Sequence, residues 1–175
     1  MYSKSKIKTQ LEKIKIEYVV ATFFGAGFFP KIPGTFASIV AFIPILLLPD
    51  FIRPVVLLTV VILLVFVSLP AIKKVETKHG SDAAIIVIDE VIGVFIIFSS
   101  PFIPVTWLSF IFGIGLFRLF DILKPSIIGK INKKQGAFYV LLDDISAALI
   151  VLILLHFIYF ILKFATFFKI INIFS

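Results

Sequence analysis

Two adjacent carboxylates, Asp89 and Glu90, stand in the middle of an almost wholly apolar run that extends over residues 85–98. A single charge at the centre of an apolar helix costs about 2.5–3.5 kcal/mol on insertion scales, and two neighbouring like charges also repel each other. A sequence keeps such a pair at a membrane surface or where a cation neutralises it, and we expect both here. The alternative is a loop whose acids have no role, which is uncommon for ionisable residues in apolar segments.

The two carboxylates can face one site only under a geometric condition. Successive residues of a helix differ by about 100°, so Asp89 and Glu90 converge only at a helix end or at a break. Carboxylate oxygens are hard ligands that suit Mg²⁺, which usually takes one or two carboxylates together with waters and phosphate oxygens. The pair therefore predicts a magnesium site at a helix terminus.

A second polar group lies further along the chain, where Arg118, Asp121 and Lys124 follow one another at intervals of three residues. On a helix they occupy an arc of roughly 120°, so that two cations flank one acid. The cations could bind a phosphate while Asp121 joins a metal. The alternative is a plain intrahelical salt-bridge ladder at the membrane interface, which these three residues taken alone favour slightly.

A second acidic pair, Asp143 and Asp144, directly precedes a long apolar run, residues 145–162. An acid at a helix N-terminus is a common cap, and the helix dipole favours it. Capping explains one of the two acids. The other has no such explanation, and paired acids again suggest a cation.

Other polar residues give weaker signals. Gly34 and Thr35 precede a helix expected over residues 36–48, whose free backbone N–H groups could bind an anion, although a loop with Thr35 as the N-cap is the commoner arrangement. His79 lies in a polar connection, and His156 lies within the last apolar run, where we assign it packing or hydrogen bonding and no chemistry. The chain has no cysteine and only two histidines, so thiolate sites are excluded and zinc is improbable.

The composition indicates the kind of scaffold that carries these groups. Of the 175 residues 61% are apolar and 15% charged, and the mean hydropathy is +1.17. Soluble domains have roughly 45–50% apolar and about 25% charged residues. We therefore predict an all-α integral membrane protein, a single domain over residues 1–175.

About four membrane-embedded helices are expected in this bundle. Residues 55–72 form the clearest span, ended or kinked by Pro70, and residues 145–162 form the last. The run over residues 83–98 and its return over residues 107–117 are short for a bilayer of roughly 30 Å and suggest a shallow or tilted hairpin.

The two ends of the chain differ in character. Residues 1–18 are basic but include acids and lack a cleavage site, so we expect an amphipathic segment on the membrane surface and not a cleaved signal peptide. Residues 163–175 form a Phe-rich tail. The net charge of +7 is better explained by anionic lipid than by nucleic acid, because the lysines flank apolar spans.

The cations also predict the orientation in the membrane. With a cytoplasmic N-terminus and alternating spans, 14 of the 17 lysines and arginines face the cytoplasm, and only Arg53, Lys163 and Lys169 lie on the other side. The same arrangement brings five acids to one membrane face, namely Asp89, Glu90, Asp121, Asp143 and Asp144.

Taken together, these stretches resemble the phosphatidylglycerophosphatase A family of bacterial membrane lipid phosphatases. The order and spacing hold over roughly residues 20–150, in four pieces: Gly25-x-Gly27 with Pro33-Gly34-Thr35-x-x-Ser38, Ile88-Asp89-Glu90-x-x-Gly93, Phe117-Arg118-x-x-Asp121-x-x-Lys124-Pro125, and Gly136 with Asp143-Asp144-x-x-Ala147. The chain departs from the family pattern at residues 82–85, 126–128 and 137–139 and at Ala148, which concern backbone shape, and it retains every acid, Arg118 and Lys124.

The resemblance implies Mg²⁺-dependent hydrolysis of phosphatidylglycerophosphate to phosphatidylglycerol and phosphate, at the cytoplasmic face of the bacterial inner membrane. The expected metal ligands are Asp89, Glu90, Asp121, Asp143 and Asp144, and all of these except Asp143 are also catalytic candidates. Arg118, Lys124, Gly34 and Thr35 are expected to hold the lipid phosphate. Two other classes stay open: a non-catalytic carrier with the acids as a cation path, and a lipid phosphotransferase. The sequence does not indicate an oligomeric state.

Overall fold

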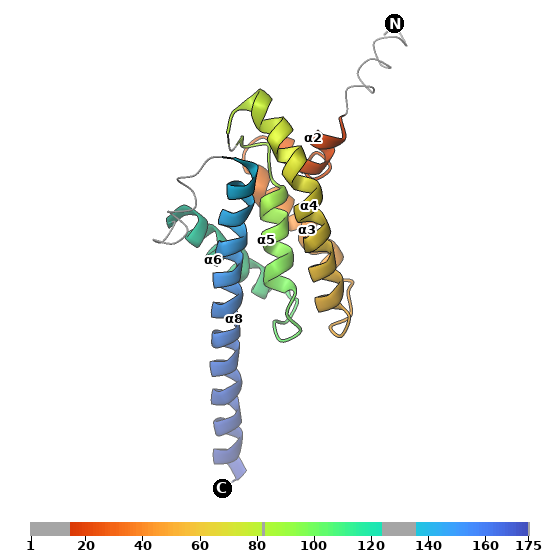
Figure 1. Cartoon of the computed structure of the whole chain (residues 1–175). Coiled ribbons are helices and arrows are strands. Elements are labelled where there is room, and N and C mark those ends of the chain that lie inside the picture. The colour runs from red at the N-terminus through yellow and green to blue at the C-terminus, as the bar shows by residue number, and fades with distance from the viewer. Residues whose placement is uncertain (1–14, 82, 124–135, 175) are drawn as a thin grey trace, which may run out of the picture.

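The computed structural model describes residues 15–81, 83–123 and 136–174, and every regular element among them is a helix (Figure 1). The all-α prediction is therefore confirmed for the described part of the chain. In chain order the elements are α2 (Ile16–Ala21), the 3₁₀ helix η1 (Ala26–Phe28), α3 (Pro33–Ile45), α4 (Arg53–His79), α5 (Ile88–Phe98), α6 (Trp107–Leu123) and α8 (Ala137–Phe174).

The short helix α5 forms the centre of the bundle. All of its residues are buried except Glu90, which is partly exposed, and it packs against α8, α3 and α4. Figure 1 shows α5 between α4 and α8. Gly93 allows α6 to approach, because a Cβ atom there would lie 2.8 Å from the ring of Phe117. A helix that is apolar on all sides is stable only when it is enclosed in this way.

Two of the described helices are long and apolar enough to cross a membrane. They are α4 and the part of α8 over Ala137–Phe167, which contain apolar stretches of 18 residues with mean hydropathies of 3.0 and 2.8. α3 is also apolar but shorter, with 13 residues. The expected number of about four membrane-embedded helices therefore stays a prediction.

The outward faces of the bundle are apolar, which is the pattern of a protein surrounded by lipid. Large hydrophobic side chains are exposed along three helices, among them Val55, Ile62, Leu63 and Phe66 on α4, Leu108, Ile111 and Phe112 on α6, and Ile153, Phe157 and Phe160 on α8. A monomeric soluble protein rarely exposes contiguous apolar surface on this scale.

Several helix boundaries differ from the sequence-based expectation. α3 begins at Pro33 and not at residue 36, because proline suits the first position of a helix. α4 continues through Pro70 to His79 and ends at Gly80, whose φ of +91° is readily adopted only by glycine. The largest difference is α8, which begins eight residues before Ile145 and continues through the Phe-rich tail to Phe174.

The approach to α5 is held by a close backbone contact. The N–H of Val87 donates to the carbonyl of Ala21 at 2.9 Å. Nearby, a Cβ atom on Gly27 would lie 2.0 Å from the carbonyl oxygen of Ile85, so only glycine fits there. This contact fixes the extended segment before α5 and thereby the position of the acids at the start of that helix.

Some predictions fall on residues outside the described ranges. They are the basic N-terminal segment as far as residue 14, and Lys124 with the basic loop that follows it. These statements therefore remain predictions from the sequence.

Candidate active site

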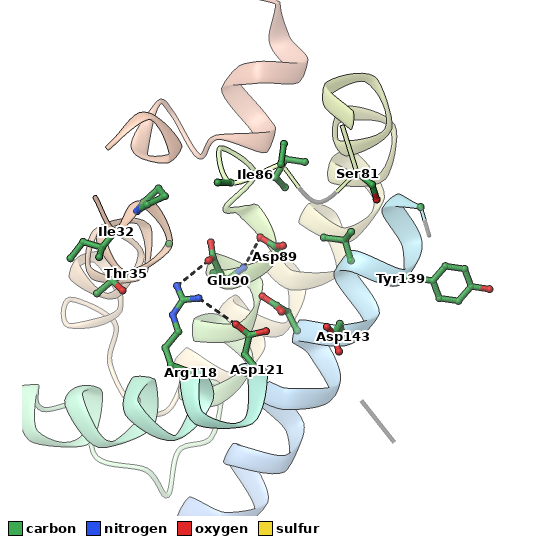
Figure 2. A pocket seen from close by; sticks show the side chains of 17 residues that line it. Ile32, Thr35, Ser81, Ile86, Asp89, Glu90, Arg118, Asp121, Tyr139 and Asp143 are labelled. Carbon is green, nitrogen blue, oxygen red and sulfur yellow. Dashed lines mark hydrogen bonds and ion pairs between the residues drawn. The ribbon is translucent and has the colours of Figure 1, made fainter. Parts of the chain in front are cut away.

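A cavity of about 610 Å³ opens at the end of the bundle where α3, α5 and α8 begin and α6 ends. Five carboxylates and one arginine line it together with apolar residues (Figure 2). Its full lining among the described residues is Ile32, Pro33, Gly34, Thr35, Ser81, Ala83, Ala84, Ile86, Asp89, Glu90, Arg118, Asp121, Gly136, Tyr139, Val140, Asp143 and Asp144. Residues spread over more than one hundred positions of the chain therefore converge on one space.

The first acidic pair lies in the first turn of α5, which begins at Ile88. At this helix end both Asp89 and Glu90 reach the cavity, as the geometric condition for an adjacent pair requires. An oxygen of Asp89 accepts the N–H of Glu90 at 3.0 Å, and the positive end of the helix dipole favours both carboxylates.

The second acidic pair corrects the capping hypothesis. α8 begins at Ala137, so Asp143 and Asp144 are the seventh and eighth residues of the helix, where neither can act as an N-cap. Their exposed fractions are only 5% and 7%. Two buried carboxylates without a capping role need compensation from another charge, and this strengthens the interpretation as part of a site.

Arg118 links the acids of two helices. Its Nη2 donates to Oε1 of Glu90 on α5 at 2.9 Å, and its Nη1 lies 3.6 Å from Oδ2 of Asp121 on α6 (Figure 2). The contact with Asp121 is the intrahelical pair that the ladder hypothesis expected. The shorter contact with Glu90 joins residues 28 positions apart, so Arg118 is more than a member of a ladder.

Three of the carboxylates lie close enough together to hold a metal ion. Asp121, Asp143 and Asp144 each offer one oxygen, and these oxygens lie within 4.8 Å of one another. A set of hard oxygen donors from two helices is suited to Mg²⁺. Asp89 and Glu90 line the same cavity beside this group, and Glu90 is engaged by Arg118.

The start of α3 forms the opposite wall. Thr35 lies within the first turn, and Ile32 is the N-cap residue, so the prediction of Thr35 as the cap was wrong. The first N–H groups of a helix have no acceptor within that helix, so those of Gly34 and Thr35 remain suited to an anion.

Gly34 is required by the ion pair beside it. A Cβ atom at this position would lie 1.9 Å from Oε1 of Glu90 and 2.2 Å from Nη2 of Arg118. Both atoms are the ends of flexible side chains, so a larger residue would displace the ion pair and leave the helix in place.

The apolar part of the lining was not predicted from the sequence. Ile32, Ala83, Ala84, Ile86 and Val140 line the cavity beside the acids, and nothing in their side-chain chemistry identifies them. Their only signal was proximity in the sequence to polar residues already singled out. Tyr139 also belongs to the wall, but its ring points away from the acids in Figure 2.

Comparison with known proteins identifies relatives of the chain. Residues 19–159 match the family described as phosphatidylglycerophosphatase A. A protein of Bacteroides thetaiotaomicron, provisionally named a phosphatidylinositol-3-phosphatase, is 33% identical over 78% of this chain and 89% of its own length. A phosphatidylglycerophosphatase A of Haemophilus influenzae is 33% identical over 75% of this chain and 82% of its own length. No solved structure matches the chain significantly.

Proposed function

The chain belongs to the phosphatidylglycerophosphatase A family, a family of phosphoric monoester hydrolases, and on that premise we propose that it hydrolyses phosphatidylglycerophosphate in a Mg²⁺-dependent reaction. The products are phosphatidylglycerol and inorganic phosphate. Two candidate membrane-crossing helices and the family together make it a membrane protein.

The observation that carries the proposal is the gathering of five carboxylates and one arginine around a single cavity. Among the described residues that line it, five carboxylates and one guanidinium leave a formal charge of −4 when all are ionised. A phosphate dianion would be repelled from such a space unless cations neutralised it. A site that combines excess acid with a place for phosphate is therefore typical of metal-assisted phosphoryl chemistry.

The residues present fit magnesium. Asp121, Asp143 and Asp144 would hold the ion, since their oxygens lie within 4.8 Å of one another and are of the type that Mg²⁺ prefers. When bound, the ion would neutralise the negative charge of the phosphoryl oxygens.

The other polar residues then take distinct roles. Arg118 binds the phosphate, with the N–H groups of Gly34 and Thr35 on the facing wall, and Glu90 holds the guanidinium in position at 2.9 Å. Asp89 is the remaining carboxylate and accepts a proton from the attacking water. The water oxygen bonds to phosphorus while the bond between phosphorus and the lipid oxygen breaks, and that lipid oxygen takes up the proton accepted by Asp89 to become the hydroxyl of phosphatidylglycerol. Lys124 would add a second cation for the phosphate.

The substrate would reach the cavity from the membrane. We place the cavity at the cytoplasmic face of a bacterial inner membrane in a multi-pass protein, because most lysines flank that end of the predicted spans. The acyl chains stay in the bilayer, and the apolar wall, including Ile32 and Ile86, lies beside the lipid headgroup.

A second candidate differs only in the headgroup. The name of the Bacteroides thetaiotaomicron relative favours an inositol lipid phosphate as substrate. The same acids and the same arginine would serve for it, since both substrates are phosphate monoesters of a lipid.

Phosphate release by the purified protein tests the proposal. We expect inorganic phosphate from phosphatidylglycerophosphate in the presence of Mg²⁺, no release in excess EDTA, and recovery when Mg²⁺ is added back. Full activity in EDTA would contradict the metal. Release from phosphatidylinositol 3-phosphate alone would favour the second candidate. Transfer of phosphate to an added alcohol without hydrolysis would indicate a phosphotransferase, and neither reaction would indicate a carrier.

A further inference from the structure

A second polar network lies at the end of α5 opposite the cavity. Arg53, at the start of α4, is fully buried and is the largest such side chain among the described residues. Its Nη2 donates to the backbone carbonyls of Ser100 at 2.7 Å and of Ile103 at 3.0 Å, and its Nη1 pairs with Asp50. Arg53 therefore holds the loop that follows α5, close to the negative end of that helix dipole.

The same loop is joined to α8 by a hydrogen bond between side chains. Oγ of Ser100 lies 2.7 Å from Nε2 of His156, and Nδ1 of His156 lies 2.8 Å from the carbonyl oxygen of Leu152. A carbonyl oxygen only accepts, so Nδ1 carries the proton, and in the neutral ring Nε2 accepts the hydroxyl of Ser100. Oγ of Ser100 in turn accepts the N–H of Phe102 at 3.2 Å.

This contact and the acidic site lie on the same two helices. Asp89 and Ser100 are separated by eleven positions along α5 and its loop, and Asp144 and His156 by twelve positions along α8. At 1.5 Å per helical residue these separations correspond to about 16 and 18 Å. α5 and α8 therefore run parallel and in register, with the acids meeting at one end and Ser100 meeting His156 at the other.

Between these two ends the helices meet through apolar side chains. From Val91 to Phe98 every residue of α5 is buried and apolar, and Ala147, Ala148 and Val151 of α8 are buried as well. Apolar contact is not directional and resists axial sliding weakly, whereas a hydrogen bond at 2.7 Å fixes a distance and a direction.

We propose that Ser100 and His156 are a positioning pair, which sets the axial register of α5 against α8 and thereby the placement of Asp89 relative to Asp143 and Asp144. The catalytic consequence rests on the proposed function. Displacement of a reacting group by about 1 Å can lower turnover by as much as 10²-fold, so loss of the pair is expected to reduce kcat without removing any group from the cavity.

The test compares two neighbouring serines in the full-length protein in lipid nanodiscs. Ser100→Ala removes the link to α8 and leaves the Ser100 carbonyl for Arg53. Ser99→Ala is the matched control, because its hydroxyl donates only within its own helix, to the carbonyl of Ile96 at 2.8 Å. With phosphatidylglycerophosphate as substrate, we expect Ser100→Ala to lower kcat about tenfold with KM within about twofold, and Ser99→Ala to change neither beyond about twofold.

Variants of His156 separate positioning from packing. His156→Leu keeps an apolar side chain of similar bulk and should lower kcat as Ser100→Ala does, and the double variant should be no worse than either single one. His156→Gln can accept the Ser100 hydroxyl and should restore most of the turnover. If His156→Leu does not fold, Ser100→Ala decides alone. Equal kcat for the Ser100→Ala and Ser99→Ala proteins would overturn the proposal.

A spectroscopic measurement keeps this proposal distinct from the proposed function. The chain contains only two histidines, so ¹⁵N-histidine labelling gives two sets of imidazole signals. We expect His156 as the Nδ1-protonated tautomer, with an Nε2 signal that shifts in Ser100→Ala while the signals of His79 stay in place. Absence of that shift would also overturn the proposal. If the Nε2 signal differs between the wild-type and Ser100→Ala proteins but the wild-type protein releases no phosphate, the proposed function is refuted and the positioning pair is not.

Discussion

The two ends of the bundle each contain an arginine, and the two arginines have opposite kinds of surroundings. Arg118 is partly exposed, at 26% for its side chain, and is paired with Glu90 and Asp121 in an open cavity. Arg53 is fully buried, and its terminal nitrogens are bound by two backbone carbonyls and by Asp50. One arginine lies among several acids, and the other lies among two backbone carbonyls and a single acid.

The two ends also differ in the ratio of acids to cations among the described residues. At Arg53 one cation meets one acid and the carbonyls that follow α5, so no formal charge is left over. At Arg118 the acids outnumber the cation by four among the described lining residues. Five carboxylates gathered around one cavity repel one another, and a cation bound among them would lower that cost. The gathering of acids around an open cavity therefore identifies the functional end.

The largest expected effect comes from removing one acid at each end. Asp144→Asn removes a formal charge from a proposed Mg²⁺ ligand, and a neutral amide is a poor ligand for that ion, so turnover should fall by about 10³-fold or more. Asp50→Asn at the other end should leave turnover within about threefold, because the amide oxygen of Asn can still accept from buried Arg53 and the change lies away from the cavity.

The measurement is phosphate release at saturating Mg²⁺, together with the amount of folded protein in the membrane. Both variants should insert normally, since removal of a charge does not hinder insertion. Equal turnover in the two variants would remove the distinction between the ends.

A smaller effect is expected from adding one methyl group at each of two glycines. In Gly34→Ala the new methyl group would overlap Glu90 and Arg118 and force that ion pair to move, so turnover should fall by about 10–100-fold with little loss of stability. Gly115→Ala is the matched control, because a Cβ atom there meets nothing within 4 Å. It should leave turnover unchanged and stabilise α6 by up to about 1 kcal/mol.

Phosphate release and thermal unfolding of the two alanine variants measure both quantities. A Gly34→Ala protein as active as Gly115→Ala would show that the Arg118–Glu90 pair has no part in turnover.

The sequence predicted the convergence of the acids better than it predicted the helices that carry them. The two acids of an adjacent pair can face one site only at a helix end or a break, and α5 does begin at Ile88. The lysine distribution indicated that the acids share one face, and Asp89, Asp121 and Asp144 do line one cavity. Both inferences follow from the cost of charge in an apolar medium, which acts wherever the chain folds.

Other features depend on contacts between distant residues and were not predictable. The preference of acids for helix N-termini placed the start of the last helix at residue 145, whereas α8 begins at Ala137 and carries its two acids as its seventh and eighth residues. A role for His156 could not be assigned because its partner Ser100 is 56 positions away and is brought to it only by the packing of α5 on α8. Gly34 was singled out as part of a helix start that could bind an anion, but the reason that only glycine fits there, the adjoining ion pair, lies on two other helices.

The two ends of the bundle are also predicted to lie on opposite sides of the membrane. Variants that test this orientation should keep their turnover. α4 connects the two ends, and Phe51 and Thr77 are exposed residues at its opposite termini, about 39 Å apart along a helix. The chain has no cysteine, so a single cysteine introduced at either position is the only reactive thiol. In sealed inverted vesicles a membrane-impermeant maleimide should label Thr77→Cys at once and Phe51→Cys only after detergent is added. Neither residue contacts the cavity, so both variants should keep wild-type turnover within about twofold.

Labelling of both positions from the same side would show that α4 does not cross the bilayer. The acidic cavity and the Arg53 network would then face the same compartment, and the difference in their charge balance could not be assigned to the two faces of a membrane.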